Sequence, residues 1–410
     1  MNNIVIGAGI SGLSVGQALA GEFLVLEKES VAGGLSGQYR AGGFAFDHGG
    51  HYFHFQNKPE IKKHVDEFQA FRAYRRNSKV LLLDRFIPFS LQYHLAYLPA
   101  RRRDAILAEI QGGQSNSAAD LESFLLANFG RHLYSLFFEP FLLKFYDRPL
   151  SGMLAKMDKG SIPVPRMEEV LAGSRAKKRS AEGYNPVFYY PVRSLQGFID
   201  SYSRPLLGRI HFSENVIRID PRKRMVYTAE GSYRYENLIS TMPLKELLGI
   251  LSPPLPFPRR QLQNLSTLVI NAVLSRRRRR FHWLYLPEKR FPFYRVGYYP
   301  GSGTVSVYLE KTIDAQAPLD GLRLAREMAL TLLQTGMISR EDEILFHDLK
   351  RIPVSYVVFD RNWPRLVPAI LASLRRQRIF SIGRYGSWNY SSMADDIQMA
   401  RDTAERINRS

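Results

Sequence analysis

Three glycines near the start of the chain have the spacing of a loop that binds the phosphates of a dinucleotide. They are Gly7, Gly9 and Gly12. The apolar segment 3–6 precedes them, and a helix-like segment, 13–20, follows them. In such a unit the first glycine makes a tight turn, the second admits a pyrophosphate to the backbone N–H groups, and the third allows close packing of the helix. The pattern therefore predicts a dinucleotide site where the first helix begins.

An acidic residue lies where the ribose of a dinucleotide would need a hydrogen-bond acceptor. The apolar segment 23–26 indicates a second strand and ends at Glu27, 20 positions after Gly7. A carboxylate at this spacing accepts from ribose hydroxyls. Because strand, spacing and acid are all present, we expect Glu27 and the three glycines to bind one cofactor.

Two further glycine segments favour a flavin over a nicotinamide as that cofactor. Gly33-Gly34-Leu35-Ser36 follows the acidic residue closely and could bring a second backbone stretch onto the same pyrophosphate, although a plain glycine turn is an alternative. Asp47-His48-Gly49-Gly50-His51 flanks two glycines with histidines. We expect this loop to press against an isoalloxazine ring. Gly34, Leu35 and Gly50 are therefore predicted contacts of FAD.

The composition excludes several other kinds of chemistry. The chain has 410 residues and no cysteine, which removes disulfides, thiolate nucleophiles and iron–sulfur ligands. Its histidines lack H-x-x-x-H spacing and no Ser-His-Asp arrangement is recognisable, so no metal site is expected. No apolar run reaches the roughly 18 residues of a membrane span. We expect a cytoplasmic protein.

The charge of the chain predicts anionic partners without choosing among them. The formal net charge is +19, and much of the excess lies in short basic runs. These are residues 101–103, 177–179, 222–224 and 276–280. None lies in a recognisable nucleic-acid module, so a nucleic-acid partner is not expected. Binding of the runs to a membrane surface or another polyanion stays open.

Secondary-structure signals divide the chain into three parts and predict an α/β protein. A discontinuous, Rossmann-like FAD-binding domain is expected from residues 1–73, 186–245 and 366–410. A helical insertion domain is expected at 99–185 from apolar residues at helical spacing, and its Lys- and Ser-rich end, 174–183, could form a mobile loop over an active site. Aromatic and β-branched runs predict an antiparallel β-sheet substrate domain from residues 74–98 and 246–365.

The sequence resembles the UDP-galactopyranose mutase family, particularly its eukaryotic-type branch, within the wider amine oxidase and protoporphyrinogen oxidase superfamily of flavoproteins. The resemblance runs along nearly the whole chain and includes the glycine segments described above. The other motifs that carry it are 86–92 (FIPFSLQ), 190–193 (YPVR), 239–243 (ISTMP), 283–288 (WLYLPE), 292–295 (PFYR) and 383–390 (GRYGSWNY). The last three of these motifs are more specific to the mutases than to the wider superfamily.

The resemblance implies roles for several residues around the flavin and a diphosphate. Arg193 and Arg295 match the arginines that hold the substrate diphosphate, as paired charge-assisted donors can. Arg384 matches a residue on the flavin pyrophosphate, and Met393 is assigned to the cofactor. His51 would lie near the flavin, where a histidine can stabilise a reduced, anionic ring electrostatically.

The resemblance also implies a substrate pocket. Tyr285, Tyr356 and Tyr390 fall where the family places phenols near the phosphates, although each could be an ordinary core tyrosine. Gln92 matches a glutamine near the uracil. Phe89 stands where the family has tyrosine, which leaves open another nucleotide, another pose, or the same uracil held by other residues.

The activity implied is interconversion of UDP-galactopyranose and UDP-galactofuranose for surface glycan synthesis. In the family a reduced flavin N5 forms an adduct with the sugar, and NADH or NADPH is the expected reductant. The partners expected are therefore a UDP-sugar and, by analogy, another copy of the chain. Two alternatives stay open: a redox flavoprotein of the same superfamily acting on another substrate, and a flavin- or nucleotide-sugar-binding protein without turnover.

Overall fold

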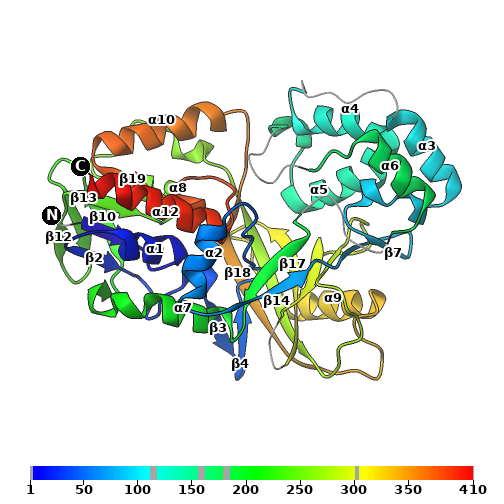
Figure 1. Ribbon diagram of the computed structural model, residues 1–410, viewed down its shortest axis with the longest axis horizontal. Coiled ribbons are helices and arrows are strands. Elements are labelled where there is room, and N and C mark those ends of the chain that lie inside the picture. The colour runs from blue at the N-terminus through cyan, green and yellow to red at the C-terminus, as the bar shows by residue number, and fades with distance from the viewer. Residues whose placement is uncertain (1–2, 111–117, 156–161, 179–184, 301–303, 410) are drawn as a thin grey trace.

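A five-stranded parallel sheet forms the left-hand part of the molecule in Figure 1, a computed structural model that describes residues 3–110, 118–155, 162–178, 185–300 and 304–409. The strand order is β19-β13-β1-β2-β9. The strands are β1 (Asn3–Ile6), β2 (Phe23–Leu26), β9 (Ile210–His211), β13 (Asn237–Ser240) and β19 (Ile379–Ser381). Every residue of β1 and β13 is buried, as expected where both faces of a parallel sheet are covered. The sheet thus joins three distant parts of the chain.

The two faces of this sheet pack against different layers. Alternation along β1 turns Val5 toward one hydrophobic core, and Ile4 and Ile6 toward another. The first core includes α1 (Ile10–Ala18), α7 (Leu195–Ser203), α12 (Met393–Asn408) and part of α2 (Pro59–Asp66). The second includes α8 (Leu244–Ile250), α10 (Trp363–Arg376) and the three-stranded sheet β10 (Val216–Asp220), β11 (Met225–Thr228) and β12 (Ser232–Arg234).

A seven-stranded sheet forms the lower right of the molecule in Figure 1. Its order is β18-β14-β17-β16-β15-β6-β7. The strands are β6 (Ser78–Leu82), β7 (Arg85–Pro88), β14 (Asn264–Leu274), β15 (Trp283–Tyr285), β16 (Arg295–Tyr298), β17 (Val305–Ile313) and β18 (Ile344–Val357). All neighbouring pairs are antiparallel except β15 and β6. The amphipathic helix α9 (Gly321–Gln334) covers one face through Leu324, Met328 and Leu332.

A helical lobe lies at the upper right in Figure 1. It contains α3 (Ala100–Ile110), α4 (Leu121–Leu133), α5 (Glu139–Tyr146) and α6 (Met167–Arg175). Asp120 begins α4 because its carboxylate accepts from the Ser123 backbone N–H at 2.9 Å. The expected loop at 174–183 is only partly described: α6 ends at Arg175, the Tyr97 hydroxyl donates to the Lys178 carbonyl, and residues 179–184 lie outside the described residues.

Two small strand pairs link these units. The hairpin β3 (Gln38–Ala41) and β4 (Phe44–Asp47) leads into the 47–51 loop, and β5 (Phe71–Arg75) pairs with β8 (Val187–Pro191). The predicted fold class is therefore confirmed: a Rossmann-like parallel sheet with a separate, largely antiparallel sheet and a helical lobe. The seven-stranded sheet is mixed rather than purely antiparallel as predicted, because β6 enters beside β15 in parallel. Within the described ranges, no helix has the length and apolarity that crossing a membrane requires.

Candidate functional site

The glycine segments of the amino-terminal half form one cradle in which Gly7 and Gly12 have no room for a side chain. Gly7 has φ +97°, and a Cβ added there would lie 2.3 Å from the Thr241 hydroxyl oxygen. A Cβ on Gly12 would lie 1.8 Å from the Gly7 carbonyl oxygen. Gly9 forms a bridge with Gly33, whose N–H donates to the Ala8 carbonyl at 2.9 Å. The two segments therefore meet where α1 begins, with unpaired helix N–H groups available to a pyrophosphate.

The other predicted cofactor residues surround this cradle. Glu27 is 5% exposed, and its carboxylate accepts from the backbone N–H of Ala8 at 2.6 Å and of Glu29 at 2.9 Å. Each carboxylate oxygen keeps a lone pair for a ribose hydroxyl. Gly34 and Leu35 lie in a 3-10 turn, and a Cβ on Gly34 would lie 3.6 Å from the Gly9 Cα. These positions fit the adenosine and pyrophosphate parts of FAD.

The carboxyl-terminal segment closes the same cradle. Gly383 has φ +77°, and a Cβ there would lie 2.4 Å from the Ser11 hydroxyl on α1. The next residue, Arg384, donates from Nη1 to the Ser391 carbonyl at 2.8 Å. Met393 then begins α12, which Ser392 caps through the Asp395 backbone N–H. Arg384 and Met393 thus lie beside the glycine cradle, as expected for cofactor contacts.

The Gly49–Gly50 loop lies flat against strand β17. A Cβ on Gly50 would lie 2.4 Å from the Tyr308 hydroxyl, and one on Gly49, which has φ +109°, would lie 3.2 Å from Glu310 Oε1. Only glycine satisfies both the conformation and the space at position 49. Because neither glycine carries a side chain, a planar ligand could approach the backbone of this loop closely.

His51 ends the loop as a neutral group. Its enclosure lowers its pKa to about 3, and the nearby positive charges of Arg384 and Arg295 add to that effect. His51 is thus a neutral imidazole at neutral pH in this structure, and its expected electrostatic role beside a reduced flavin stays a prediction. The Nδ1 atom has no hydrogen-bond partner among the described residues, so it is available to a ligand.

Two arginines and two tyrosines gather next to His51. Arg295 Nη2 lies 3.5 Å from the Tyr356 hydroxyl, and Tyr356 stacks on Tyr390 with ring centroids 6.2 Å apart. The Arg384 guanidinium lies 4.3 Å from the centre of the Tyr390 ring and 5.2 Å from that of Tyr356. Two cations and two phenols on neighbouring elements form a site that suits a diphosphate.

Phe89 and Gln92, predicted to bind the base, and Tyr285, predicted near the phosphates, lie at the junction of the seven-stranded sheet and the helical lobe. The Phe89 and Tyr285 rings are 4.5 Å apart, and Phe141 on α5 packs edge-on against Tyr285. Gln92 donates from Nε2 to the Pro163 carbonyl at 2.8 Å, while its buried Oε1 has no partner among the described residues. Phe89 thus supplies an aromatic face despite replacing a tyrosine, and Gln92 Oε1 can accept from a base N–H.

Sequence reasoning missed Arg76, which lies between these aromatic residues. Its Nη2 donates to the Tyr285 hydroxyl at 2.8 Å and its Nε to the Ser78 hydroxyl at 2.9 Å. The guanidinium also lies over Trp283, 4.7 Å from the ring, and faces Phe89 at 5.5 Å. Arg76 is 7% exposed. A buried arginine on aromatic faces strengthens the positive field of the site, but Arg75-Arg76 in the sequence resembles any basic pair.

Arg193 lies apart from this group. It follows β8 and is exposed beside the start of α7, where its Cβ approaches Gly197. The opposite end of β8 approaches β15, because Phe188 packs on Trp283. Five residues of extended chain separate the two ends by roughly 16 Å. The shared role of Arg193 and Arg295 at one diphosphate therefore stays a prediction.

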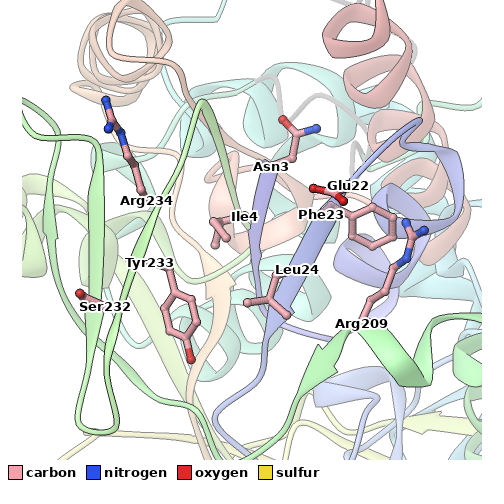
Figure 2. Close-up of a pocket in the computed structure, with 9 residues that line it drawn as sticks. All are labelled: Asn3, Ile4, Glu22, Phe23, Leu24, Arg209, Ser232, Tyr233 and Arg234. Carbon is pink, nitrogen blue, oxygen red and sulfur yellow. The ribbon is translucent and has the colours of Figure 1, made fainter. Parts of the chain in front are cut away.

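A distinct pocket of about 550 Å³ lies at the opposite end of the parallel strands, where β1 and β2 begin (Figure 2). Ile4 and Leu24 lie between Arg209 on one side and Arg234 on the other. These residues are at the beginnings of β1 and β2, whereas Gly7 follows the end of β1. Ligands of open α/β sheets bind beyond the carboxyl ends of the strands, so this pocket is separate from the candidate site.

Comparison with known proteins agrees with this geometry. Residues 5–68 match the NAD(P)-binding Rossmann-like domain family. The structure is similar to reduced UDP-galactopyranose mutase, with a TM-score of 0.90 and 22% identity over 99% of this chain and 95% of that one. It is also similar to a provisionally named protoporphyrinogen oxidase from Exiguobacterium sp. 255-15, with a TM-score of 0.75 and 15% identity over 100% and 98% of the two chains.

A third similar structure is putrescine oxidase with putrescine bound, with a TM-score of 0.66 and 15% identity over the full length of both chains. The chain therefore has the fold shared by these flavoenzymes, with its dinucleotide cradle intact. Within that class, it shares the fold of UDP-galactopyranose mutase over nearly its whole length. The resemblance seen in the sequence is thus confirmed for the fold.

Proposed function

We propose that the protein is an FAD-dependent nucleotide-sugar mutase that interconverts pyranose and furanose forms, with UDP-galactose as the simplest substrate. The cluster of Arg295, Tyr356 and Tyr390 beside the His51 loop carries the proposal. A diphosphate needs several charge-assisted donors, and this cluster supplies them next to the predicted flavin. The similarity to UDP-galactopyranose mutase supports the same assignment.

The chain's own residues would bind and orient the substrate. Arg295 and the phenols would hold the diphosphate, which becomes a better leaving group as its charge is neutralised. Phe89 would contact the base, Gln92 Oε1 would accept its N–H, and Tyr285, packed on Phe89, would lie toward the phosphates. These contacts leave the sugar between the diphosphate residues and the Gly49–Gly50 loop. Orientation at that point provides much of the rate enhancement available to a protein in such a reaction.

FAD would be held by the glycine cradle, Glu27, Arg384 and Met393. When bound and reduced, it supplies the nucleophilic chemistry that the side chains lack. We propose NADH or NADPH as the reductant. His51 would meet the flavin as a neutral hydrogen-bond donor, because its pKa is lowered to about 3.

A redox flavoprotein of the same superfamily is the competing assignment, supported by the oxidase-like structures. An apolar substrate would require an apolar channel next to the flavin. The residues around the loop are instead a partly buried arginine, a buried carboxylate and several phenols. This polarity argues against an apolar substrate, and the donors on Arg295 and the phenols suit a phosphorylated one.

Substitution of Arg295 tests the assignment. The reduced Arg295→Ala enzyme should convert UDP-galactofuranose at least about 100-fold more slowly than wild type, since a buried charge-assisted contact to the leaving diphosphate is lost. Arg323→Ala is the matched control, because Arg323 is 63% exposed on α9. Wild-type turnover in Arg295→Ala would contradict the proposed diphosphate role.

A further inference from the structure

Arg295 forms a buried ion pair whose partner has no part in the function described so far. Glu310 lies directly opposite Arg295 in the β16–β17 register. The carboxylate accepts from Arg295 Nη2 at 2.8 Å and, through its second oxygen, from Nε. The Arg295 side chain is 17% exposed and that of Glu310 only 5%. The ion pair is therefore bidentate and largely shielded from water, which makes it strong and geometrically specific.

The position of Glu310 fixes which edge of the guanidinium remains open. Nε and one side of Nη2 face the carboxylate, and Nη2 also lies 3.5 Å from the Tyr356 hydroxyl. The remaining donors, on Nη1, have no partner in any hydrogen bond among the described residues. An anion arriving beside Tyr356 would therefore meet an arginine that is already oriented and already neutralised by one carboxylate.

Glu310 also lies directly under the predicted flavin loop. A Cβ on Gly49 would be 3.2 Å from Glu310 Oε1, so no side chain separates the carboxylate from the loop backbone. The backbone of Glu310 is anchored as well, since its carbonyl accepts from the Tyr294 N–H at 3.0 Å. The charge of Glu310 thus acts on both the proposed diphosphate site and the loop.

We propose that Glu310 is a positioning residue with two effects: it orients Arg295 toward the diphosphate, and its negative charge limits how tightly that diphosphate is held. This inference rests on the proposed function. A site with several unopposed cations would retain a nucleoside diphosphate sugar after each turnover. Compensation of Arg295 by a fixed carboxylate weakens substrate and product binding alike and permits release.

The two effects predict opposite results for two variants. Glu310→Gln keeps the length of the side chain and removes the charge, so UDP should bind the oxidised holoenzyme about tenfold more tightly, and kcat and KM should both fall. Glu310→Asp keeps the charge but shortens the side chain, so Arg295 is drawn away from Tyr356 and UDP should bind about threefold or more weakly. Glu327→Gln is the control, because Glu327 pairs with Lys311, the neighbour of Glu310 on β17.

Titration calorimetry of each flavin-loaded variant with UDP measures these affinities. Weaker or unchanged UDP binding by Glu310→Gln would overturn the charge effect, and unchanged binding by Glu310→Asp would overturn the orientation effect. A purely structural role would weaken binding in both. If Glu310→Gln does not fold, Glu310→Asp alone still decides the orientation effect. Failure of the proposed function would look different, because the wild-type protein would then not bind UDP.

Discussion

Asp47 is a buried carboxyl whose environment predicts an unusual dependence of stability on pH. It accepts from Gln38 Nε2 at 2.7 Å and from the Tyr190 hydroxyl at 3.0 Å, yet burial raises its pKa to about 7. The folded protein therefore binds this proton more tightly than the unfolded chain. The stability from this group is complete below about pH 4 and is lost as pH rises toward 7.

Asp47→Asn should remove that loss. We expect the variant to gain about 4 kcal/mol over wild type at pH 8, and little or nothing at pH 4, in urea unfolding of the holoenzyme. Asp104→Asn provides a control, since the Asp104 side chain is 62% exposed. An equal effect of Asp47→Asn at both pH values would show that the carboxyl does not titrate in this range.

At the scale of single residues, the sequence predicted positions whose requirements are local. Gly7 and Gly12 were recognisable because tight turns and helix packing dictate glycine over a few neighbouring residues. Arg76 and Glu310 were not, because their contacts depend on how distant strands align. Arg193 stays a prediction: its sequence context suggested a site residue, and in the structure it is exposed just after β8, beside the start of α7.

Helix α5 shows how an element fixes the helical lobe to the seven-stranded sheet. Lys144 donates to the carbonyls of Leu286 at 2.6 Å and Glu288 at 2.7 Å, just after β15. Burial lowers its pKa to about 8, although Glu288 opposes that shift. Since Tyr285 ends β15, this connection also holds the wall of the proposed base pocket.

Lys144→Met should therefore loosen the lobe. Two buried carbonyls would lose a charged donor, which should cost about 2–3 kcal/mol of unfolding free energy. Affinity for UDP should fall as well, whereas Lys63→Met on the exposed face of α2 should change neither. Thermal unfolding and UDP titration test both points, and a Lys144→Met protein with wild-type values would contradict this role for α5.

Regular elements were predictable where periodicity was strong, but the contacts made by surface runs were not. The strands at 3–6 and 23–26 and the helix from Met393 appear as expected. The basic run 276–280 is an exposed, irregular loop, as its composition suggests, but its contacts were not predictable: Arg278 pairs with Asp342 and Arg279 donates to the Gly336 carbonyl. Partners some 60 residues away decide such contacts, and local composition carries no signal of them.

Acid should destabilise the molecule as a whole. Enclosure lowers the pKa of five histidines to about 3 or 4, namely His48, His51, His54, His94 and His282. They favour the native state above pH 6.5, and that contribution is lost as pH falls toward 4. Asp47 and Asp396, with raised pKa values of about 7 and 6, act in the opposite direction.

Near pH 5 the five histidines take up protons on unfolding and the two aspartates release them, so about three protons are taken up in total. The free energy of unfolding should therefore fall by about 4 kcal/mol for each pH unit. Urea unfolding between pH 7 and 5 should show this steep fall. A stability that is flat over this range would mean that the histidines are protonated in the native protein.

The arrangement of the whole molecule places the proposed site where its parts meet. The cradle belongs to the parallel sheet, the arginine and carboxylate to the seven-stranded sheet, and Phe141 to the helical lobe. Sequence patterns indicated these three parts, and they indicated that the part with the parallel sheet is assembled from separate segments of the chain. Their mutual placement required the structure, because no local pattern specifies how three units dock.

Chromatography of UDP-galactofuranose incubated with the purified flavin-loaded protein, with and without dithionite, tests the central claim most directly. The account predicts that UDP-galactopyranose appears only in the reduced sample. Absence of conversion in both samples would contradict the mutase assignment for this substrate and favour the redox alternative or another nucleotide sugar.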